Sequence, residues 1–76
     1  MNAQRRNLIK AVLADLADLR GRVETIQSEE QDAFDNMPES LQATERGQAN
    51  EAASEALDEA LSAFDEIGSS LNEAMA

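Results

Sequence analysis

The chain has one strong break, in the stretch Asp35-Asn36-Met37-Pro38-Glu39-Ser40-Leu41. The proline ring removes a backbone hydrogen-bond donor and moves the residue before it out of the helical region. No other proline occurs in the sequence, and both sides of the break are rich in residues that favour helices. The sequence therefore predicts two long helices that meet at this corner.

We predict a single all-α domain over residues 1–76, with one helix over about 3–35, a corner over about 36–43 and a second helix over about 44–75. Two helices of similar length joined by a short corner form an antiparallel, coiled-coil-like hairpin. In the corner, Asn36 or Asp35 is expected to cap a short turn, and Glu39 to complete a capping box. Thr44 is a suitable cap for the second helix.

Apolar residues recur through the first half of the chain at alternating steps of three and four. They are Ile9, Val12, Leu16, Leu19, Val23 and Ile26. This is heptad spacing, so these side chains are expected to form the seam that faces the second helix. Leu8 and Leu13 widen that seam, and Gly21 falls opposite it.

The second half carries a broader apolar stripe, which is mostly alanine near the corner. Its members are Ala49, Ala53, Ala56, Leu57, Ala60, Leu61, Phe64, Ile67, Leu71 and Met75. Small side chains allow close approach, so we expect the helices to be tightly spaced near the corner. The stripe is wider than one facing helix can cover, which predicts a homodimer that forms an antiparallel four-helix bundle.

The net charge of −10 is unevenly distributed. Residues 1–23 hold five cations against two acids, and residues 24–76 hold fourteen acids against Arg46. Folding the chain about residue 39 predicts these neighbours: Arg5 and Arg6 with Glu73, Lys10 with Glu66, and Arg20 and Arg22 with Asp58 and Glu59. Pairing that sets the register is favoured over a phosphate-binding strip, because nearby acids would cancel the field of the cations.

The same folding predicts an acidic surplus at the corner end of the hairpin. The acids there are Glu24, Glu29, Glu30, Asp32, Asp35, Glu39, Glu45, Glu51 and Glu55. They form either a solvated face that prevents aggregation or a site for a basic protein surface. Charge runs are usually solvated, so composition alone favours the first interpretation.

Residue types needed for catalysis and metal binding are scarce. The chain has no cysteine and no histidine, so no serine has an imidazole to activate it and the usual zinc and haem ligands are missing. The carboxylates lack calcium-loop spacing. We therefore predict a protein that is not an enzyme and that needs no metal or cofactor. The absence of cysteine and of a long apolar run is consistent with a cytoplasmic protein without a membrane span.

The corner contains the most distinctive residues of the sequence and is the candidate partner-binding site. We assign to it Asp32, Phe34, Asp35, Asn36, Met37, Glu39, Leu41, Gln42, Glu45 and Arg46. One interpretation is structural: Phe34, Met37 and Leu41 close the end of the bundle while polar residues cap the helices. The other is a recognition tip with exposed apolar anchors, and neither is favoured by the sequence.

The stretch 32–46 resembles the corner of small acidic proteins encoded by bacteriophages and related mobile elements. The shared pattern is Phe-Asp-Asn, a hydrophobic residue and Pro-Glu, then Leu-Gln and finally Glu-Arg. An Ala/Glu/Leu helix follows it. The resemblance covers about residues 24–67 and implies a helical hairpin and a phage origin. Gly47 and Ala49 are smaller than that pattern suggests. The family has no settled biochemical role, so the resemblance implies no mechanism.

These observations predict a phage-type accessory protein that binds and modulates or inhibits a host or viral protein. In its boldest form, the acidic surface mimics nucleic acid and blocks a host defence protein in the host cytoplasm. The alternative is an RNA-binding helical bundle that uses the cations of the first helix: Arg5, Arg6, Lys10, Arg20 and Arg22. A third possibility is a purely structural oligomerisation or virion component.

Overall fold

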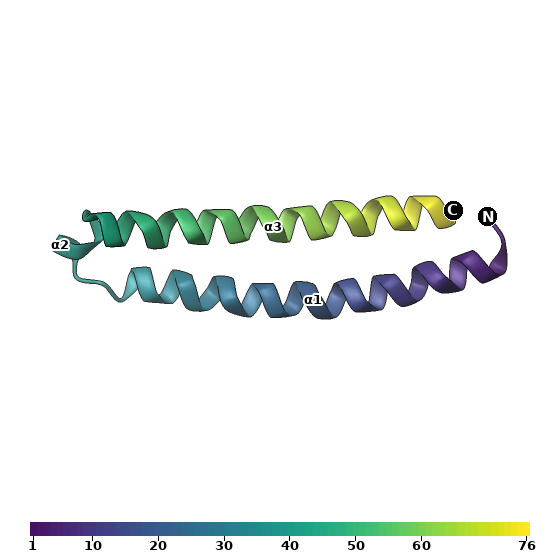
Figure 1. The fold of residues 1–76 in the computed structure, drawn as a ribbon, viewed down its shortest axis with the longest axis horizontal. Coiled ribbons are helices and arrows are strands. Elements are labelled where there is room, and N and C mark those ends of the chain that lie inside the picture. The colour runs from purple at the N-terminus through teal and green to yellow at the C-terminus, as the bar shows by residue number, and fades with distance from the viewer.

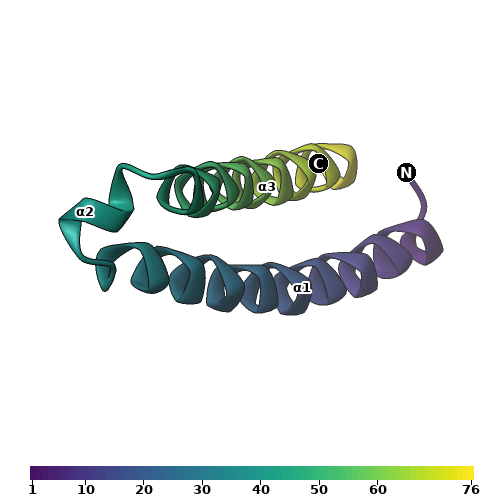
Figure 2. The same ribbon diagram turned by 60° about the vertical axis from the view of Figure 1, so that its left-hand side comes forward.

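The computed structural model describes residues 1–76, which form three helices and no strands. Helix α1 spans Ala3–Asp35, the short α2 spans Glu39–Gln42, and α3 spans Glu45–Met75. The two long helices lie side by side and antiparallel, with both termini at the end away from α2 (Figures 1 and 2). The result is a rod of 58 × 15 × 13 Å. The predicted all-α hairpin is confirmed.

The helix ends explain where the chain turns. The Asn2 side chain accepts a hydrogen bond from the Arg5 amide at 2.8 Å and so caps α1. At the other end, Asn36 is the C-cap of α1 rather than the start of the next turn. Pro38 takes the N-cap position of α2 without a side-chain cap, so the predicted capping box is wrong. Because Met37 and Pro38 separate Asn36 from α2, its side chain does not cap that helix.

Thr44 occupies the predicted N-cap position of α3, with extended backbone angles of φ −82° and ψ 171°. Its side chain nevertheless accepts no hydrogen bond from the first turn of α3. The hydroxyl donates instead to the carbonyl oxygen of Leu41, the third residue of α2. Thr44 therefore ties the start of α3 back to the corner without capping the first turn of α3.

The face of α1 that packs on α3 is rotated from the predicted one. Its half-buried residues include Ile9, Leu13, Leu16, Arg20, Val23, Gln27, Gln31 and Phe34. Val12, Leu19 and Ile26, which we expected in the seam, are 47%, 43% and 52% exposed. The apolar repeat thus supplies only half of the seam, and polar residues supply much of the rest.

On α3 the seam residues follow one another at steps of three and four. They are Gly47, Asn50, Ser54, Leu57, Leu61, Phe64, Gly68, Leu71 and Met75. Near the corner, the buried small residues are Gly47 and Ser54, whereas Ala49 and Ala56 are exposed. The closest approach is therefore made by Gly47 and Ser54, and of the predicted alanines near the corner only Ala53 is half-buried. No hydrophobic side chain in the rod is fully buried.

A polar layer interrupts the apolar packing in the corner half of the rod, which comprises residues 24–61. Ser54 is only 2% exposed, and its hydroxyl donates to Gln31 Oε1 at 2.8 Å. Gln27 Nε2 donates to the same hydroxyl at 3.2 Å, and Gln31 Nε2 donates to Asp35 at 3.1 Å. Each buried polar atom in this layer has a partner, which removes the cost of burying it.

The register of the hairpin differs from the one expected. Arg20 Nε lies 2.8 Å from Asp65, Gln27 contacts Ser54, and Arg6 Nε donates to the Met75 carbonyl oxygen at 3.2 Å. The chain therefore doubles back about residues 41–42 and not at 39, because α2 adds a turn to the corner. The predicted ion pairs with Asp58, Glu59, Glu66 and Glu73 are wrong, since Arg20 makes both ion pairs of the structure.

Neither long helix contains an apolar stretch sufficient to cross a bilayer.

Gly21 lies on the outer surface of α1, where an added Cβ would meet no atom within 4 Å. Gly21→Ala is expected to raise the free energy of unfolding by about 1 kcal/mol, because alanine loses less backbone entropy in a helix. Thermal unfolding followed by circular dichroism measures this. A lower melting temperature would mean that Gly21 contacts something outside the isolated hairpin.

Candidate functional site

The corner is held together by one glutamine side chain. Gln42, the last residue of α2, is half-buried, and its Nε2 donates to the carbonyl oxygens of Phe34 at 3.1 Å and Met37 at 3.2 Å. Both carbonyls belong to the segment that ends α1, so the side chain fixes α2 against that end. The corner is thus a defined structural element whose backbone is held against the end of α1.

The structure divides the ten predicted site residues into two groups. Phe34, Met37 and Gln42 are half-buried and support the corner. The others are exposed: Asp32, Asp35, Asn36, Glu39, Leu41, Glu45 and Arg46. Leu41 is 44% exposed and is the one large apolar side chain of the site that solvent reaches freely. The exposed surface of the predicted site is therefore mainly acidic, and Leu41 is its one exposed large apolar side chain.

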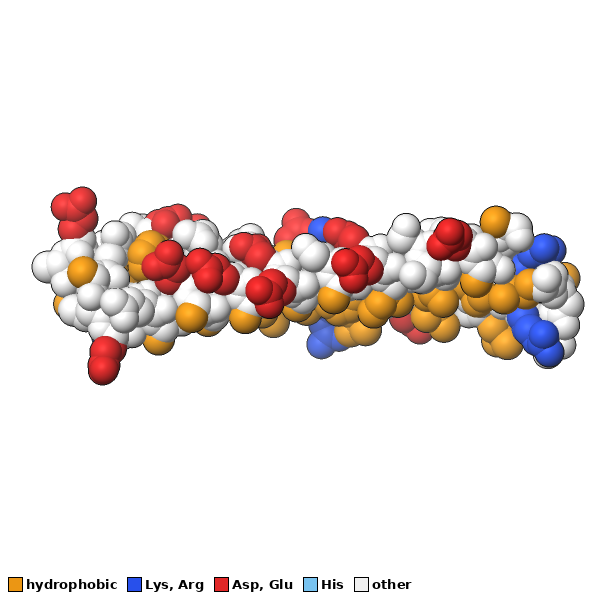
Figure 3. Space-filling model, turned by 90° about the horizontal axis from the view of Figure 1, so that it is seen from above, with side chains coloured by type: hydrophobic (Ala, Val, Ile, Leu, Met, Phe, Trp, Pro, Cys, Tyr) orange, Lys and Arg blue, Asp and Glu red, His pale blue; other side chains and the backbone are white.

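Most acids of the corner half have no counter-charge. Of the nine acids expected there, only Glu24 forms an ion pair, at 2.8 Å from Arg20. Arg46, the one cation of that region, forms none. Figure 3 shows acidic side chains from the corner end along α3 and basic side chains at the end that holds the termini. The corner half therefore presents a negative field to solvent.

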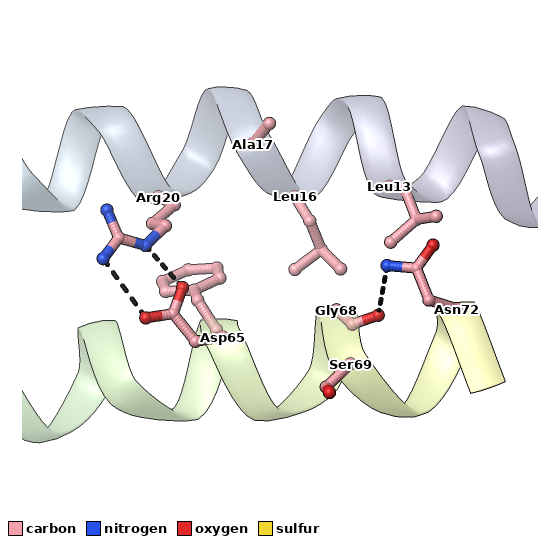
Figure 4. A pocket seen from close by; sticks show the side chains of 9 residues that line it. Leu13, Leu16, Ala17, Arg20, Asp65, Gly68, Ser69 and Asn72 are labelled. Atoms are coloured by element: carbon pink, nitrogen blue, oxygen red, sulfur yellow. Dashed lines mark hydrogen bonds and ion pairs between the residues drawn. The ribbon is translucent and has the colours of Figure 1, made fainter.

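The one pocket of the rod lies between α1 and α3 on the terminal side of its middle (Figure 4). It has a volume of about 340 Å³ and is lined by Leu13, Leu16, Ala17, Arg20, Phe64, Asp65, Gly68, Ser69 and Asn72. Gly68 leaves space there, since an added Cβ would meet nothing within 4 Å. The lining charges, Arg20 and Asp65, bind each other, so the pocket offers no free acid or base.

Arg20 is the most constrained cation of the chain. Its guanidinium donates to both carboxylate oxygens of Asp65, at 2.8 and 3.3 Å, and to Glu24 at 2.8 Å. The hydrogen bond and the charge of Asp65, followed by those of Glu24, raise the pKa of Arg20 above its usual value. Two carboxylates thus occupy the group that the RNA-binding hypothesis requires for phosphate.

The remaining cations of α1 do not form a strip. Lys10 is one heptad before Ala17, which lines the pocket, whereas Arg5 is one heptad before Val12, on the opposite side of the seam. Arg6 faces α3 and donates to its last turn. A phosphate backbone following α1 would therefore meet isolated charges on different faces, which is a weak arrangement for nucleic acid.

Sequence reasoning missed two features of the surface. The pocket depends on Gly68 facing a leucine-rich part of α1, a juxtaposition that only the correct register reveals. The exposed line of Val12, Leu19 and Ile26 was visible in the sequence but was assigned to the inside. No group of three or more acidic side chains has the arrangement that could hold a metal ion.

No family model, curated protein or solved structure matches the chain.

Proposed function

We propose that the chain is a non-enzymatic accessory protein, of the kind that bacteriophages encode, which binds and modulates or inhibits a host or viral protein through its acidic corner. The observation that carries the proposal is the acidic corner half, in which eight of nine expected acids have no ion-pair partner. A negative surface of this kind attracts a basic protein surface and accelerates association. Mimicry of nucleic acid against a defence protein is one form of this function.

The architecture of the corner supports a recognition role. A connection that only closed a hairpin needs few residues, yet here the corner contains α2, and the Gln42 hydrogen bonds hold the backbone of α2 against the end of α1. Leu41 adds apolar area among the exposed acids. A backbone that is already ordered loses less entropy when a partner binds, so the held corner favours affinity.

We also propose that the working unit is a homodimer, in which two hairpins form a four-helix bundle. A 76-residue chain without a single fully buried hydrophobic residue has little to offset the entropy of folding. Large exposed apolar side chains lie along α1 and would become buried between two copies. Sedimentation equilibrium measures this state directly.

RNA binding has less support, because Arg20 is engaged by Asp65 and Glu24, and the other cations are spread over several faces. A structural oligomerisation or virion component would use the apolar face without using the acidic corner. Under either of these two possibilities, removing charge from the corner would not weaken partner binding, whereas the leading proposal predicts that it does.

The variant Asp32→Asn/Glu39→Gln/Glu45→Gln removes three exposed charges from the corner. We expect it to weaken capture of the native partner from host lysate by about tenfold at 150 mM salt, because each exposed charge contributes a modest Coulomb energy. Capture by the unaltered protein is expected to fall steeply from 50 to 500 mM salt.

The matched control is Asp18→Asn/Glu66→Gln/Glu73→Gln, which removes the same charge from exposed positions outside residues 24–61. It should retain the partner. Equal loss in both triple variants would show that net charge and not the corner decides binding. A complex that is insensitive to salt would overturn the electrostatic proposal.

A further inference from the structure

Four of the large exposed apolar side chains form one line along α1. Leu8 is 62% exposed and Val12 47%, followed at heptad spacing by Leu19 and Ile26 at 43% and 52%. Heptad spacing keeps residues on one side of a helix. This line is separate from the seam, because each of its last three members directly precedes a seam position on α1.

A matching line lies on α3. Ala53, Ala60 and Ile67 are spaced by seven, and each directly precedes a seam residue of α3, as Val12 and Leu19 do on α1. Since the two helices are antiparallel, the same offset on both places the lines on the same side of the hairpin. Figure 3 shows this apolar band along one edge of the rod, beside the row of acids on α3. The hairpin thus has one continuous apolar side, opposite the pocket.

The charge along the rod indicates what covers this side. Residues 24–61 make up the corner half and hold eleven acids against Arg46. Residues 1–23 and 62–76 make up the terminal half and hold five cations against five acids. A second copy with its corner at the same end would place two strongly negative halves side by side. A copy turned end for end places each negative half beside a neutral half that holds all the remaining cations, which lowers the repulsion.

We infer that the apolar side binds a second copy of this chain turned end for end, about a twofold axis that passes next to Leu19. Leu19 is the midpoint of α1, so the two α1 helices overlap along their full length. Val12 of one copy then lies against Ile26 of the other, and Asp15 approaches Arg22 of the second copy. This inference rests on the proposed dimer. It adds which side of the hairpin forms the interface and how the two copies are oriented.

The α3 helices obey the same symmetry. The register of the hairpin places the axis beside Ala63 on α3, since Gln27 faces Ser54 and Arg20 faces Asp65. Ala60 of one copy is then opposite Ile67 of the other, so a small side chain meets a large one twice. Such alternation fills an interface without voids. The acidic corners finish at opposite ends of the assembly.

Cysteine cross-linking tests the arrangement, because the chain contains no cysteine of its own. Under mild oxidation, Leu19→Cys alone is expected to form a disulfide-linked dimer, since a residue at the axis lies next to itself. Val12→Cys and Ile26→Cys should each remain unlinked alone and form the mixed dimer when combined. Ala14→Cys, on the exposed opposite face of α1, measures the background of random collision.

The alternative arrangement predicts a different pattern. If the corners lay at the same end, α1 would contact α3 of the second copy. A mixture of Leu19→Cys with Ala63→Cys would then link, and Leu19→Cys alone would not. That result would overturn the inference and leave the dimer intact. Sedimentation equilibrium of the unaltered protein separates the two questions, because a monomer at all concentrations would overturn the dimer as well.

Charge exchange provides a second readout that needs no oxidation. Asp15→Arg and Arg22→Asp should each raise the dimer dissociation constant about tenfold, because each occurs twice in the interface and creates a like-charge pair. The double variant Asp15→Arg/Arg22→Asp should recover the original constant, since it restores both opposite-charge pairs. No recovery would contradict the end-for-end arrangement even if both single variants fold.

Discussion

The variant Gly47→Ala is expected to lose at least about 2 kcal/mol of unfolding free energy and to melt about 10 °C lower. An ideal Cβ at this position would lie 2.2 Å from the carbonyl oxygen of Gln42 and 2.6 Å from its Cα. These are backbone atoms, so no side-chain rotation relieves the clash. Either α3 moves away from the corner or the Gln42 backbone shifts.

The displacement of Gln42 has a further effect. Its side chain donates to Phe34 and Met37, and these bonds hold α2 against the end of α1. Gly47→Ala should therefore also expose the corner, which hydrogen exchange at α2 detects. Gly21→Ala is the matched control, because it makes the same chemical change where no atom lies within 4 Å. Equal melting temperatures for both variants would contradict the close approach at Gly47.

The variant Ser54→Leu should lose about 2–3 kcal/mol of unfolding free energy. Ser54 is 2% exposed between α3 and α1, so a leucine there forces the helices apart. It also removes the hydroxyl that bonds Gln27 and Gln31 at 3.2 and 2.8 Å. Gln27 Nε2 and Gln31 Oε1 then lose this partner while half-buried. Chemical denaturation followed by circular dichroism measures the loss.

Ser62→Leu is the control for this change, because Ser62 is an exposed serine on the same helix. It carries the same gain in helix propensity without the steric and hydrogen-bond cost, so its stability should equal or slightly exceed that of the unaltered protein. If Ser54→Leu were as stable as Ser62→Leu, the polar layer would not be closely packed.

The hairpin could be predicted because its signals are local. A single proline between two helix-rich halves fixes the number of long helices and the place where the chain reverses. The details of the corner are less local. Pro38 could be read as a break, but the turn of α2 that follows it moves the reversal to about residues 41–42. That shift changes every pairing between the long helices.

The face of α1 could not be predicted from its apolar repeat. Val12 and Leu13 both fit a heptad pattern, and hydrophobicity alone favours the line that contains Val12, Leu19 and Ile26. Arg20 and Gln27 take the inner positions instead, because their partners Asp65 and Ser54 stand opposite them on α3. Such complementarity depends on two segments far apart in the sequence. The acidic surplus of the candidate site, by contrast, could be predicted, because the distribution of charge along the chain already shows it.

Because no apolar side chain of the single hairpin is fully shielded, the proposed dimer would tie the survival of this protein to its abundance. When folding requires association, dilution shifts the balance toward the unfolded chain. Proteases remove unfolded chains, so newly made molecules are short-lived until enough of them accumulate to meet one another. If the proposed dimer is required for folding, the level of the protein would therefore respond to its rate of synthesis with a threshold, without any separate regulator.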